Sequence, residues 1–418
     1  MSDIVITGIG VISPMGVGRE AFWDSCRKAR SGIQKIVNFE TRSFRSNIAG
    51  WVENFNAKDY MPARVYRRMS RVSRMAVAAS IEALEDSKLA LDTIDKDRVG
   101  VIIGTAYGSS SHVEDFFVSL LKDGPRGAQP FLFPETVPNA PASHISMVHG
   151  ITGPNTTFCQ NDISAENAIL YAVNLLSQDI VDVVLVGGAD ELTAMQYGCY
   201  DALGVLNKIK AENDVPVTPV SGGGLVLGEG AGILIMEKSD TAKNRQAPIY
   251  GTLKAGVNTG GTTSIGRYEV EGAQTFRAIS LAIEHAGINR NETEKQIDII
   301  DVSANFSSEL DRMEYDQLKK IFPKHIDNLM VTPLKYLMGN FGGAGAIRVA
   351  AVLLSLRRQL PLPSINVCTL KGEPPYGTLN WHIPPARKLQ TALMTSSTFG
   401  GGNCSLVFTC PPADSGEK

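Results

Sequence analysis

Short, β-branched apolar runs alternate along this chain with stretches in which apolar residues recur every three or four positions. The apolar runs cover residues 4–8, 99–103, 182–186, 224–227, 232–237, 297–302, 393–396 and 405–409, and the helical patterns cover 65–86, 164–178, 273–286, 312–321 and 344–357. Strands that alternate with helices in this way indicate an α/β fold. Because residues 183–186 (Val-Val-Leu-Val) are apolar at every position, we expect sheets that are covered by helices on both faces.

The charge balance and the apolar pattern exclude several classes of protein. With 40 Lys and Arg against 43 Asp and Glu, the net charge is −3, which gives no overall field to hold nucleic acid or an anionic membrane. No apolar run approaches the length of about 18 residues that a membrane span needs, and the start, MSDIVITGIG, lacks the features of an export signal. We therefore expect a cytoplasmic protein that binds neither nucleic acid nor a membrane.

The six cysteines and six histidines show no pattern of metal ligands. The chain has no CxxC and no HExxH spacing, and His144 and His149 form the one close histidine pair. Such scattered residues predict reduced thiols and no metal site.

The most linker-like segment, residues 241–248, is polar and ends in Ala-Pro. We place a boundary there, between an N-terminal half (residues 1–245) and a C-terminal half (residues 246–410). The last residues, 411–418, are rich in proline and charge, which predicts a disordered tail.

Residues 153–167 have the pattern of a strand, a sharp turn and a helix that begins near Ser164. Asp162 lies at this turn. The free N–H groups and the dipole of a helix N-terminus favour negative charge, and a nucleophilic thiolate is therefore expected at such a place. The segment resembles the corresponding part of the β-ketoacyl-ACP synthases, the condensing enzymes of fatty-acid and polyketide synthesis.

Eight further motifs resemble the same family in the same order, and together they span nearly the whole chain. They are VITGIGVISPMG (5–16), VGVIIGTAYG (99–108), FPETVPNAPASHISMVHGITGPN (133–155), VLVGGADELT (184–193), LVLGEGAGILIME (225–237), KYLMGNFGGAGA (335–346), PSIN (363–366) and TFGGGNCSLVF (398–408). The resemblance implies a thiolase-like fold: five layers in the order αβαβα, built from two pseudo-duplicated halves.

The chain departs from the family at the residues that carry the chemistry. The spacing that the family keeps around its nucleophilic cysteine leads to Asp162, and Cys159 comes three residues too early. Asn305 and Asn340 stand where the two family histidines are expected, whereas Lys335 of the family motif is retained. The resemblance therefore implies that the catalytic set Cys, His, His has become Asp, Asn, Asn.

These replacements would prevent condensation by this chain alone. A thiolate takes an acyl group from a thioester at nearly equal energy, whereas Asp162 would have to form an unstable mixed anhydride. Other roles for the residues remain open: Asp162 as a helix N-cap or as a functional carboxylate, Asn305 and Asn340 as buried amides hydrogen-bonded to Asp162, and Lys335 in a structural ion pair with Asp162.

A condensing fold without its catalytic set resembles the chain length factor of type II polyketide synthases, although the usual replacement there is glutamine. The resemblance implies a heterodimer with an active ketosynthase and a tunnel for the polyketide or polyene chain at their interface. The substrate would be carried on the phosphopantetheine of an acyl carrier protein, so this chain would need no cofactor of its own.

Two sets of residues would then serve the tunnel and the carrier. In the first set, Phe116 or Phe117 forms the tunnel floor beside His112, and Phe399 resembles the family's gating aromatic; alternatively, both phenylalanines are core residues. The second set lies along one helix face and would dock the acidic carrier; it consists of Arg64, Arg67 or Arg68, and Arg71. Alternatively, these arginines form a basic face that only contacts solvent.

Two other functions are compatible with the sequence. A malonyl-ACP decarboxylase would use Asn305 and Asn340 as an oxyanion site and would need no nucleophile. A repurposed acyltransferase or condensing enzyme would use Cys159 or the carboxylate of Asp162.

Overall fold

The computed structural model describes residues 3–212, 223–289, 293–323, 329–365, 381–385 and 387–411. Most of the predicted tail, residues 412–418, lies outside these ranges. None of the helices in the described ranges combines the length and apolar character needed to cross a membrane.

Eleven strands of the described residues form one large mixed sheet in the order β11-β10-β14-β15-β9-β1-β8-β7-β5-β6, with β2 paired to β1. They are β1 (Ile4–Ser13), β2 (Gly16–Val17), β5 (Val99–Gly104), β6 (Asn155–Phe158), β7 (Val183–Asp190), β8 (Gly230–Lys238), β9 (Gly251–Gly260), β10 (Ile299–Asp301), β11 (Met330–Thr332), β14 (Thr391–Ser397) and β15 (Gly402–Thr409). Two small hairpin sheets pair β3 (Ile33–Lys35) with β4 (Ile48–Gly50), and β12 (Ser364–Ile365) with β13 (Trp381–His382).

The two halves of the large sheet repeat one pairing pattern. In the first half, β8 is antiparallel to both β1 and β7, and β5 is parallel to both β7 and β6. In the second half, β15 is antiparallel to both β9 and β14, and β10 is parallel to both β14 and β11. A short antiparallel contact between β1 and β9 joins the halves. The predicted pseudo-duplication is therefore confirmed.

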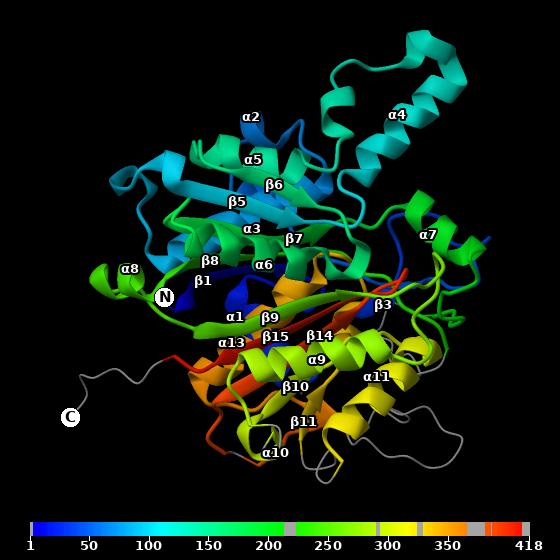
Figure 1. The fold of residues 1–418 in the computed structure, drawn as a ribbon. Helices are drawn as coiled ribbons and strands as arrows, with labels where there is room; N and C mark the ends of the chain where they lie inside the picture. The colour runs from blue at the N-terminus through cyan, green and yellow to red at the C-terminus, as the bar shows by residue number, and fades with distance from the viewer. Residues whose placement is uncertain are drawn as a thin grey trace.

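Helices cover both faces of each half (Figure 1). The helices are α1 (Arg19–Arg27), α2 (Ala63–Tyr66), α3 (Arg71–Ser87), α4 (Ser110–Asp123), α5 (Ala140–His149), α6 (Ser164–Ser177), α7 (Ala194–Ala202), α8 (Ser239–Asn244), α9 (Ala273–His285), α10 (Thr293–Gln296), α11 (Ser308–Ile321), α12 (Lys335–Met338) and α13 (Ala344–Arg358). In Figure 1, α3 and α5 lie on one side, α6 and α13 between the two halves, and α9 and α11 on the other side. This is the predicted αβαβα layering.

Two predicted elements differ from the structure. The helix predicted over residues 65–86 is two helices, α2 and α3, because the chain turns at Ser70, whose hydroxyl caps α3 by accepting from the Ser73 N–H. The strand predicted over residues 224–227 is also wrong, since Leu225 and Leu227 make only isolated bridges. Gly224 lies close against the backbone of Leu206, and Gly228 lies close against the backbone of Met338. These contacts favour a tight loop over regular strand pairing.

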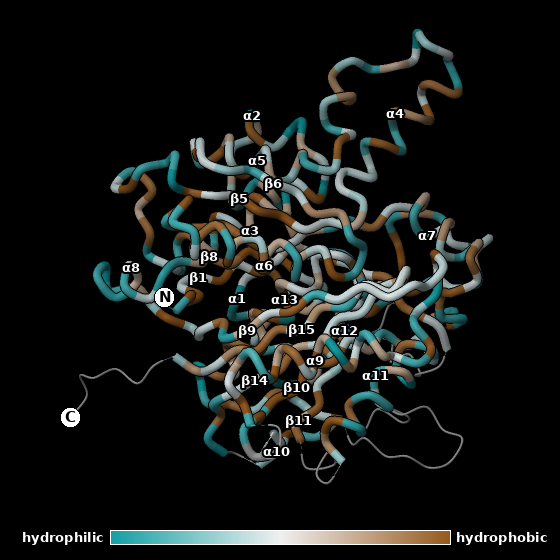
Figure 2. Tube along the Cα trace, in the orientation of Figure 1, coloured by the Kyte–Doolittle hydropathy of each residue, from teal (hydrophilic) through white to brown (hydrophobic). Residues whose placement is uncertain are grey.

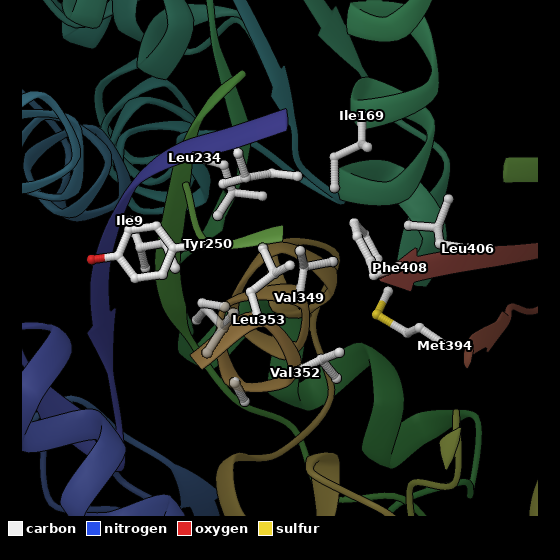
Figure 3. Packing of buried hydrophobic residues seen from close by; sticks show 14 of the residues in the cluster. Ile9, Ile169, Leu234, Tyr250, Val349, Val352, Leu353, Met394, Leu406 and Phe408 are labelled. Carbon is white, nitrogen blue, oxygen red and sulfur yellow. The ribbon is translucent and has the colours of Figure 1, made fainter. Parts of the chain in front are cut away.

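The central helix α13 is buried along nearly its whole length, and its apolar side chains form the middle of the core (Figure 3). Val349, Val352 and Leu353 pack between Leu234 of the first half and Phe408 of the second. This contact between layers explains why α13, a helix in the middle of the fold, has almost no polar face.

One part of the fold extends away from the layered body. We call residues 110–137 the arm; it contains α4 and the 3₁₀ turn Phe133–Glu135, and it projects outward in Figure 1. Figure 2 shows hydrophobic positions along this arm, and Ser110 is the only buried residue of α4. The arm therefore exposes apolar side chains that the body does not cover.

Candidate functional site

Asp162 lies at a sharp turn between β6 and α6. It belongs to the 3₁₀ turn Asn161–Ile163, and α6 begins two residues later at Ser164. The preceding Asn161 has a left-handed backbone (φ 51°), a conformation that asparagine tolerates better than most residues. The predicted strand, turn and helix around Asp162 are therefore confirmed.

Asp162 is buried, with only 4% of its surface exposed. Its Oδ1 accepts a hydrogen bond from Nδ2 of Asn340 at 2.8 Å, and its backbone N–H donates to Oγ1 of Thr398 at 3.3 Å. The N-cap of α6 is Ile163, and no side chain caps it. The N-cap interpretation of Asp162 is therefore wrong, whereas the predicted bond between Asp162 and a buried asparagine is confirmed for Asn340.

Lys335 is buried in α12, and its ammonium has no hydrogen-bond partner among the described residues. The predicted ion pair with Asp162 is therefore not a direct contact. Charge still couples the two groups: burial raises the pKa of Asp162, and the Lys335 charge opposes this rise. Burial likewise lowers the pKa of Lys335, and Asp162 opposes the fall.

Asn305 makes a different set of bonds. Its Nδ2 donates to the hydroxyl oxygen of Tyr268 at 2.8 Å, its Oδ1 accepts from the Ser307 N–H at 3.1 Å, and its own N–H donates to Oδ1 of Asp311 at 3.0 Å. The predicted hydrogen bond from Asn305 to Asp162 is therefore wrong. The amide is fixed at both ends by other partners.

Four aromatic side chains lie beside these residues. The ring of Phe399 is 4.5 Å from that of Tyr268 and 6.5 Å from that of Tyr200, measured between centroids. Tyr200 also shares a hydrogen bond of 2.8 Å with the hydroxyl of Tyr107. Sequence analysis identified only Phe399, because Tyr200 and Tyr268 lie outside the family motifs and Tyr107, although inside the motif of residues 99–108, had no role to single it out.

The structure has two separate spaces here. Asp162, Asn340 and Tyr200 line an inner cavity of about 20 Å³, which is room for about one water molecule. An outer cleft of about 550 Å³ is lined by Cys159, Asn161, Thr398 and Phe399, among others. Asp162 does not line the outer cleft.

Cys159 is exposed and directly follows β6. The pKa of its thiol is raised, first by partial burial and then by the negative charge of Asp190. A thiol with a raised pKa forms little thiolate at neutral pH, which makes it a poor nucleophile.

The comparisons with known proteins agree with this geometry. The family signature described as "Beta-ketoacyl synthase, N-terminal domain" matches residues 1–242, and "Beta-ketoacyl synthase, C-terminal domain" matches residues 250–368. The chain belongs to the β-ketoacyl synthase family.

Two relatives of this β-ketoacyl synthase-family chain are named as synthases. The 3-oxoacyl-(acyl-carrier-protein) synthase 2 of Vibrio cholerae is 29% identical over 416 residues, which are 97% of this chain and 98% of that protein. The protein of the same name from Staphylococcus aureus is 30% identical over 413 residues, 97% of each chain.

Two solved structures share the fold. The ishigamide ketosynthase/chain length factor aligns with a TM-score of 0.86 and 23% identity, covering 98% of this chain and 100% of that chain. A ketosynthase in complex with its chain length factor from Xenorhabdus doucetiae aligns with a TM-score of 0.80 and 21% identity, covering 98% of each chain. The predicted thiolase-like fold is thus confirmed.

Of the predicted tunnel and gating residues of this family member, His112, Phe116 and Phe117 lie on the arm, whereas Phe399 lies between β14 and β15. Phe117 is 51% exposed, and its ring contacts Phe116, which in turn contacts Phe133. The alternative that both phenylalanines are core residues is therefore wrong. His112 has a buried Nδ1 with no hydrogen-bond partner in the described chain, and burial lowers its pKa.

The predicted carrier-docking arginines do not share one helix face. Arg64 lies in α2 and Arg67 and Arg68 in the turn after it, and all three are exposed. Arg71, in α3, instead forms an ion pair at 2.6 Å with the buried Glu229 and lies over the ring of Trp51. The prediction of one shared helix face is wrong because the chain turns between α2 and α3, and a buried carboxylate of the body holds the Arg71 guanidinium.

Proposed function

We propose that this chain is a non-catalytic, chain-length-determining subunit that pairs with an active β-ketoacyl synthase. The observation that supports this most strongly is Asp162: at the turn before α6, where the family has its nucleophile, the chain presents a buried carboxylate bonded to Asn340.

The backbone around both asparagines supports the correspondence with the family. Gly339, before Asn340, has φ 82°, and Phe306, after Asn305, has φ 76°. Left-handed backbone of this kind favours glycine, and the family motifs have glycine next to each histidine. Phe306 keeps that conformation without a glycine, so the loop has kept its shape while its chemistry changed.

The chemistry of a carboxylate argues against covalent catalysis at this site. An acyl group on Asp162 would be an anhydride, far above a thioester in energy, and no thiol lines the inner cavity. An amide donor such as that of Asn340 carries no charge and stabilises a developing oxyanion less than a protonated histidine does.

Two features support association with a partner. Among the strands that the structure describes, β6 lies at the end of the sheet and pairs only with β5, so its outer edge can pair with a second chain. The arm exposes Phe117, Leu121, Phe131 and Phe133, and exposed apolar patches of this kind mark interaction surfaces. The exposed Arg64, Arg67 and Arg68 supply positive charge for steering an acidic acyl carrier protein.

The test is a comparison of this chain alone with its complex. A tagged full-length chain is purified from its own organism, and its partners are identified by mass spectrometry. The protein alone and in complex is then incubated with acyl-ACP and malonyl-ACP, with the Vibrio cholerae synthase as positive control. We expect an intact ketosynthase at a ratio near 1:1, and product only from the complex.

Three outcomes would contradict the proposal. An acyl adduct on this chain, or ketoacyl product made by this chain alone, would identify an active condensing enzyme. Acetyl-ACP formed by this chain alone would identify a malonyl-ACP decarboxylase. A stable homodimer that binds no ketosynthase would remove the proposed partner.

A further inference from the structure

The arm joins the body of the molecule at two roots. Residues 105–109 lead from β5 into the arm, and residues 138–139 lead from the arm into α5. The ring of Phe116 packs against those of Phe117 and Phe133 within the arm, so these contacts do not tie it to the body. The contacts at the two roots therefore set the direction in which the arm projects (Figure 1).

A buried carboxylate of the body holds the first root. Glu191 directly follows β7 and is 2% exposed. Its Oε1 accepts a hydrogen bond from the Ser111 N–H at 2.6 Å, and its Oε2 accepts one from the Val72 N–H at 3.0 Å. Val72 and Ser111 are the second residues of α3 and α4, and N–H groups in the first turn of a helix have no partner within that helix. One side chain therefore joins the beginnings of two helices.

Two further hydrogen bonds join this root to the body. Nε2 of Gln196, in α7, donates to Oγ of Ser110 at 2.6 Å. The hydroxyls of Ser109 and Ser70 share a bond of 2.9 Å, and Ser70 is the residue that caps α3. The start of α4 is therefore held by polar groups from three parts of the body.

One side-chain pair holds the second root. Glu135 lies in the 3₁₀ turn Phe133–Glu135, and both of its carboxylate oxygens lie within 2.9 Å of Nε2 of His144. His144 belongs to α5, which packs against α3 in the body, and it is 8% exposed. The arm is therefore tied to the body at both ends.

We infer that Glu191 and His144 are positioning residues that hold the arm in its outward orientation in the free chain, before a partner binds. This inference rests on the proposed function and makes it more specific, because it names the residues that prepare the association surface. A partner that needs the outward orientation binds only the fraction of molecules that have it, so the apparent Kd equals the intrinsic Kd divided by that fraction. Glu191 and His144 are themselves buried and act on the partner through the arm.

The test measures the orientation of the arm in the full-length chain on its own. Leu121, on the arm, and Ile180, on the body, are both exposed, and each is replaced by a genetically encoded keto amino acid that carries a spin label. This chemistry leaves the native cysteines unlabelled. Double electron–electron resonance then gives the distribution of distances between the two labels. We expect one narrow distribution for the chain that carries only the labels.

Glu191→Gln should broaden this distribution. The amide keeps the shape of the carboxylate but places an NH₂ group opposite the N–H of Ser111 or of Val72, so one helix start loses its acceptor. Loss of a bond to a charged group should lower the ratio of outward to other orientations by about ten-fold. Glu135→Ala removes the bond to His144 and should lower the ratio by about three-fold, since such pairs near the surface contribute less. The double variant should lower it further.

Glu314→Gln is the matched control. Glu314 is also a buried carboxylate that accepts two backbone bonds, from the Ser303 N–H at 2.8 Å and from the Ala304 N–H at 3.0 Å. It lies in α11, in the other half of the molecule, and its replacement should leave the distribution narrow. Circular dichroism and the urea midpoint show that each variant is folded.

The binding of the partner gives a second measurement. Glu191→Gln should raise the Kd for the partner by the factor by which the outward fraction falls, whereas Glu314→Gln should leave the Kd unchanged. A purely structural role of Glu191 would give the same Kd for both variants.

Two results would overturn the inference. A broad distribution in the chain that carries only the labels would show that the arm has no fixed orientation. A narrow, unshifted distribution in the double variant of Glu191 and Glu135 would show that other contacts hold the arm. Because the labels report on the free chain and the proposed function is tested by the partners and products of the unaltered chain, each can fail while the other stands.

Discussion

The centre of the molecule around Asp162 and the arm around Phe117 differ in what their side chains contact. At the centre, Asp162, Asn305 and Tyr268 are buried and bonded to one another or to neighbouring loops. On the arm, Phe117 and Leu121 are 51% and 83% exposed. The polar groups of the centre find their partners within this chain, whereas the arm has apolar surface that only another molecule can cover.

This difference indicates which property of the fold the chain has kept. A catalytic centre has to admit a substrate, and this one is filled by aromatic rings and an amide. An association surface has to remain exposed in the free chain, and the arm does. We therefore expect changes at the centre to act on folding, and changes on the arm to act on assembly.

The largest expected effect is at the centre. Arg348 is fully buried, with Nε 2.7 Å from Oδ2 of Asp301 and Nη1 3.6 Å from Oε1 of Glu166. Replacing Arg348 by Met leaves both carboxylates without a cation and should lower the free energy of unfolding by about 3–5 kcal/mol. Urea unfolding followed by circular dichroism measures this change.

A surface arginine provides the control for this prediction. Arg358 pairs with Glu20 at 2.6 Å, but the two side chains are 29% and 62% exposed. Arg358→Met should cost no more than about 1 kcal/mol. Equal losses for the two variants would show that the buried charges do not stabilise the centre.

The next effect concerns the arm. The double substitution Phe117→Asp and Leu121→Asp places charge on the exposed apolar surface and should weaken binding of the partner by about 100-fold, since a few apolar anchors dominate such interfaces. The unfolding free energy should stay within about 0.5 kcal/mol, as for other surface changes. Binding is measured by surface plasmon resonance with the purified partner.

Ile180→Asp is the matched control for the arm variant. Ile180 is also exposed, at 45%, and lies after α6 instead of on the arm. It should leave partner binding unchanged. Unchanged binding by the arm variant would show that the apolar arm is not the interface.

The smallest effect lies at the C-terminal end of α5, the helix that follows the arm. His149, the last residue of α5, shares a hydrogen bond of 2.8 Å with Ser80, and burial, with the nearby charge of Lys96, lowers its pKa to about 4. The unfolded state, with a pKa of about 6.5, takes up a proton first as pH falls, so stability decreases by about 2 kcal/mol between pH 6.5 and 5.

His149→Gln should remove this part of the pH dependence. Urea midpoints at pH 7.5 and pH 5 measure it, and His285→Gln, on the exposed face of α9, is the control. If His149→Gln leaves the acid sensitivity unchanged, another group causes it.

The sequence predicted the elements that repeat a strong local pattern. The bounds of α6, α9 and α13 agree with the predicted helices to within one residue, since their apolar spacing persists over several turns. The break between α2 and α3 was missed because the pattern runs through Ser70, whose cap is visible only once its hydroxyl finds the Ser73 N–H.

At the candidate site, the residues that carry a family motif could be named from the sequence, and their partners could not. Asp162, Asn305 and Asn340 were identified by spacing. Their partners are distant in the chain: Asn305 bonds to Tyr268, and Asn340 bonds to Asp162. The same holds for the ion pair between Arg71 and Glu229.

By itself the sequence determined the layered α/β fold and the family, since both follow from local periodicity and from motifs read in order. It also determined which chemical groups stand at the turn before α6. Only the tertiary structure decided that Asn340, and not Asn305, bonds to Asp162 and that the arm stands free. Both depend on packing between segments far apart in the chain, where volume and hydrogen-bond geometry decide the contacts and sequence spacing does not.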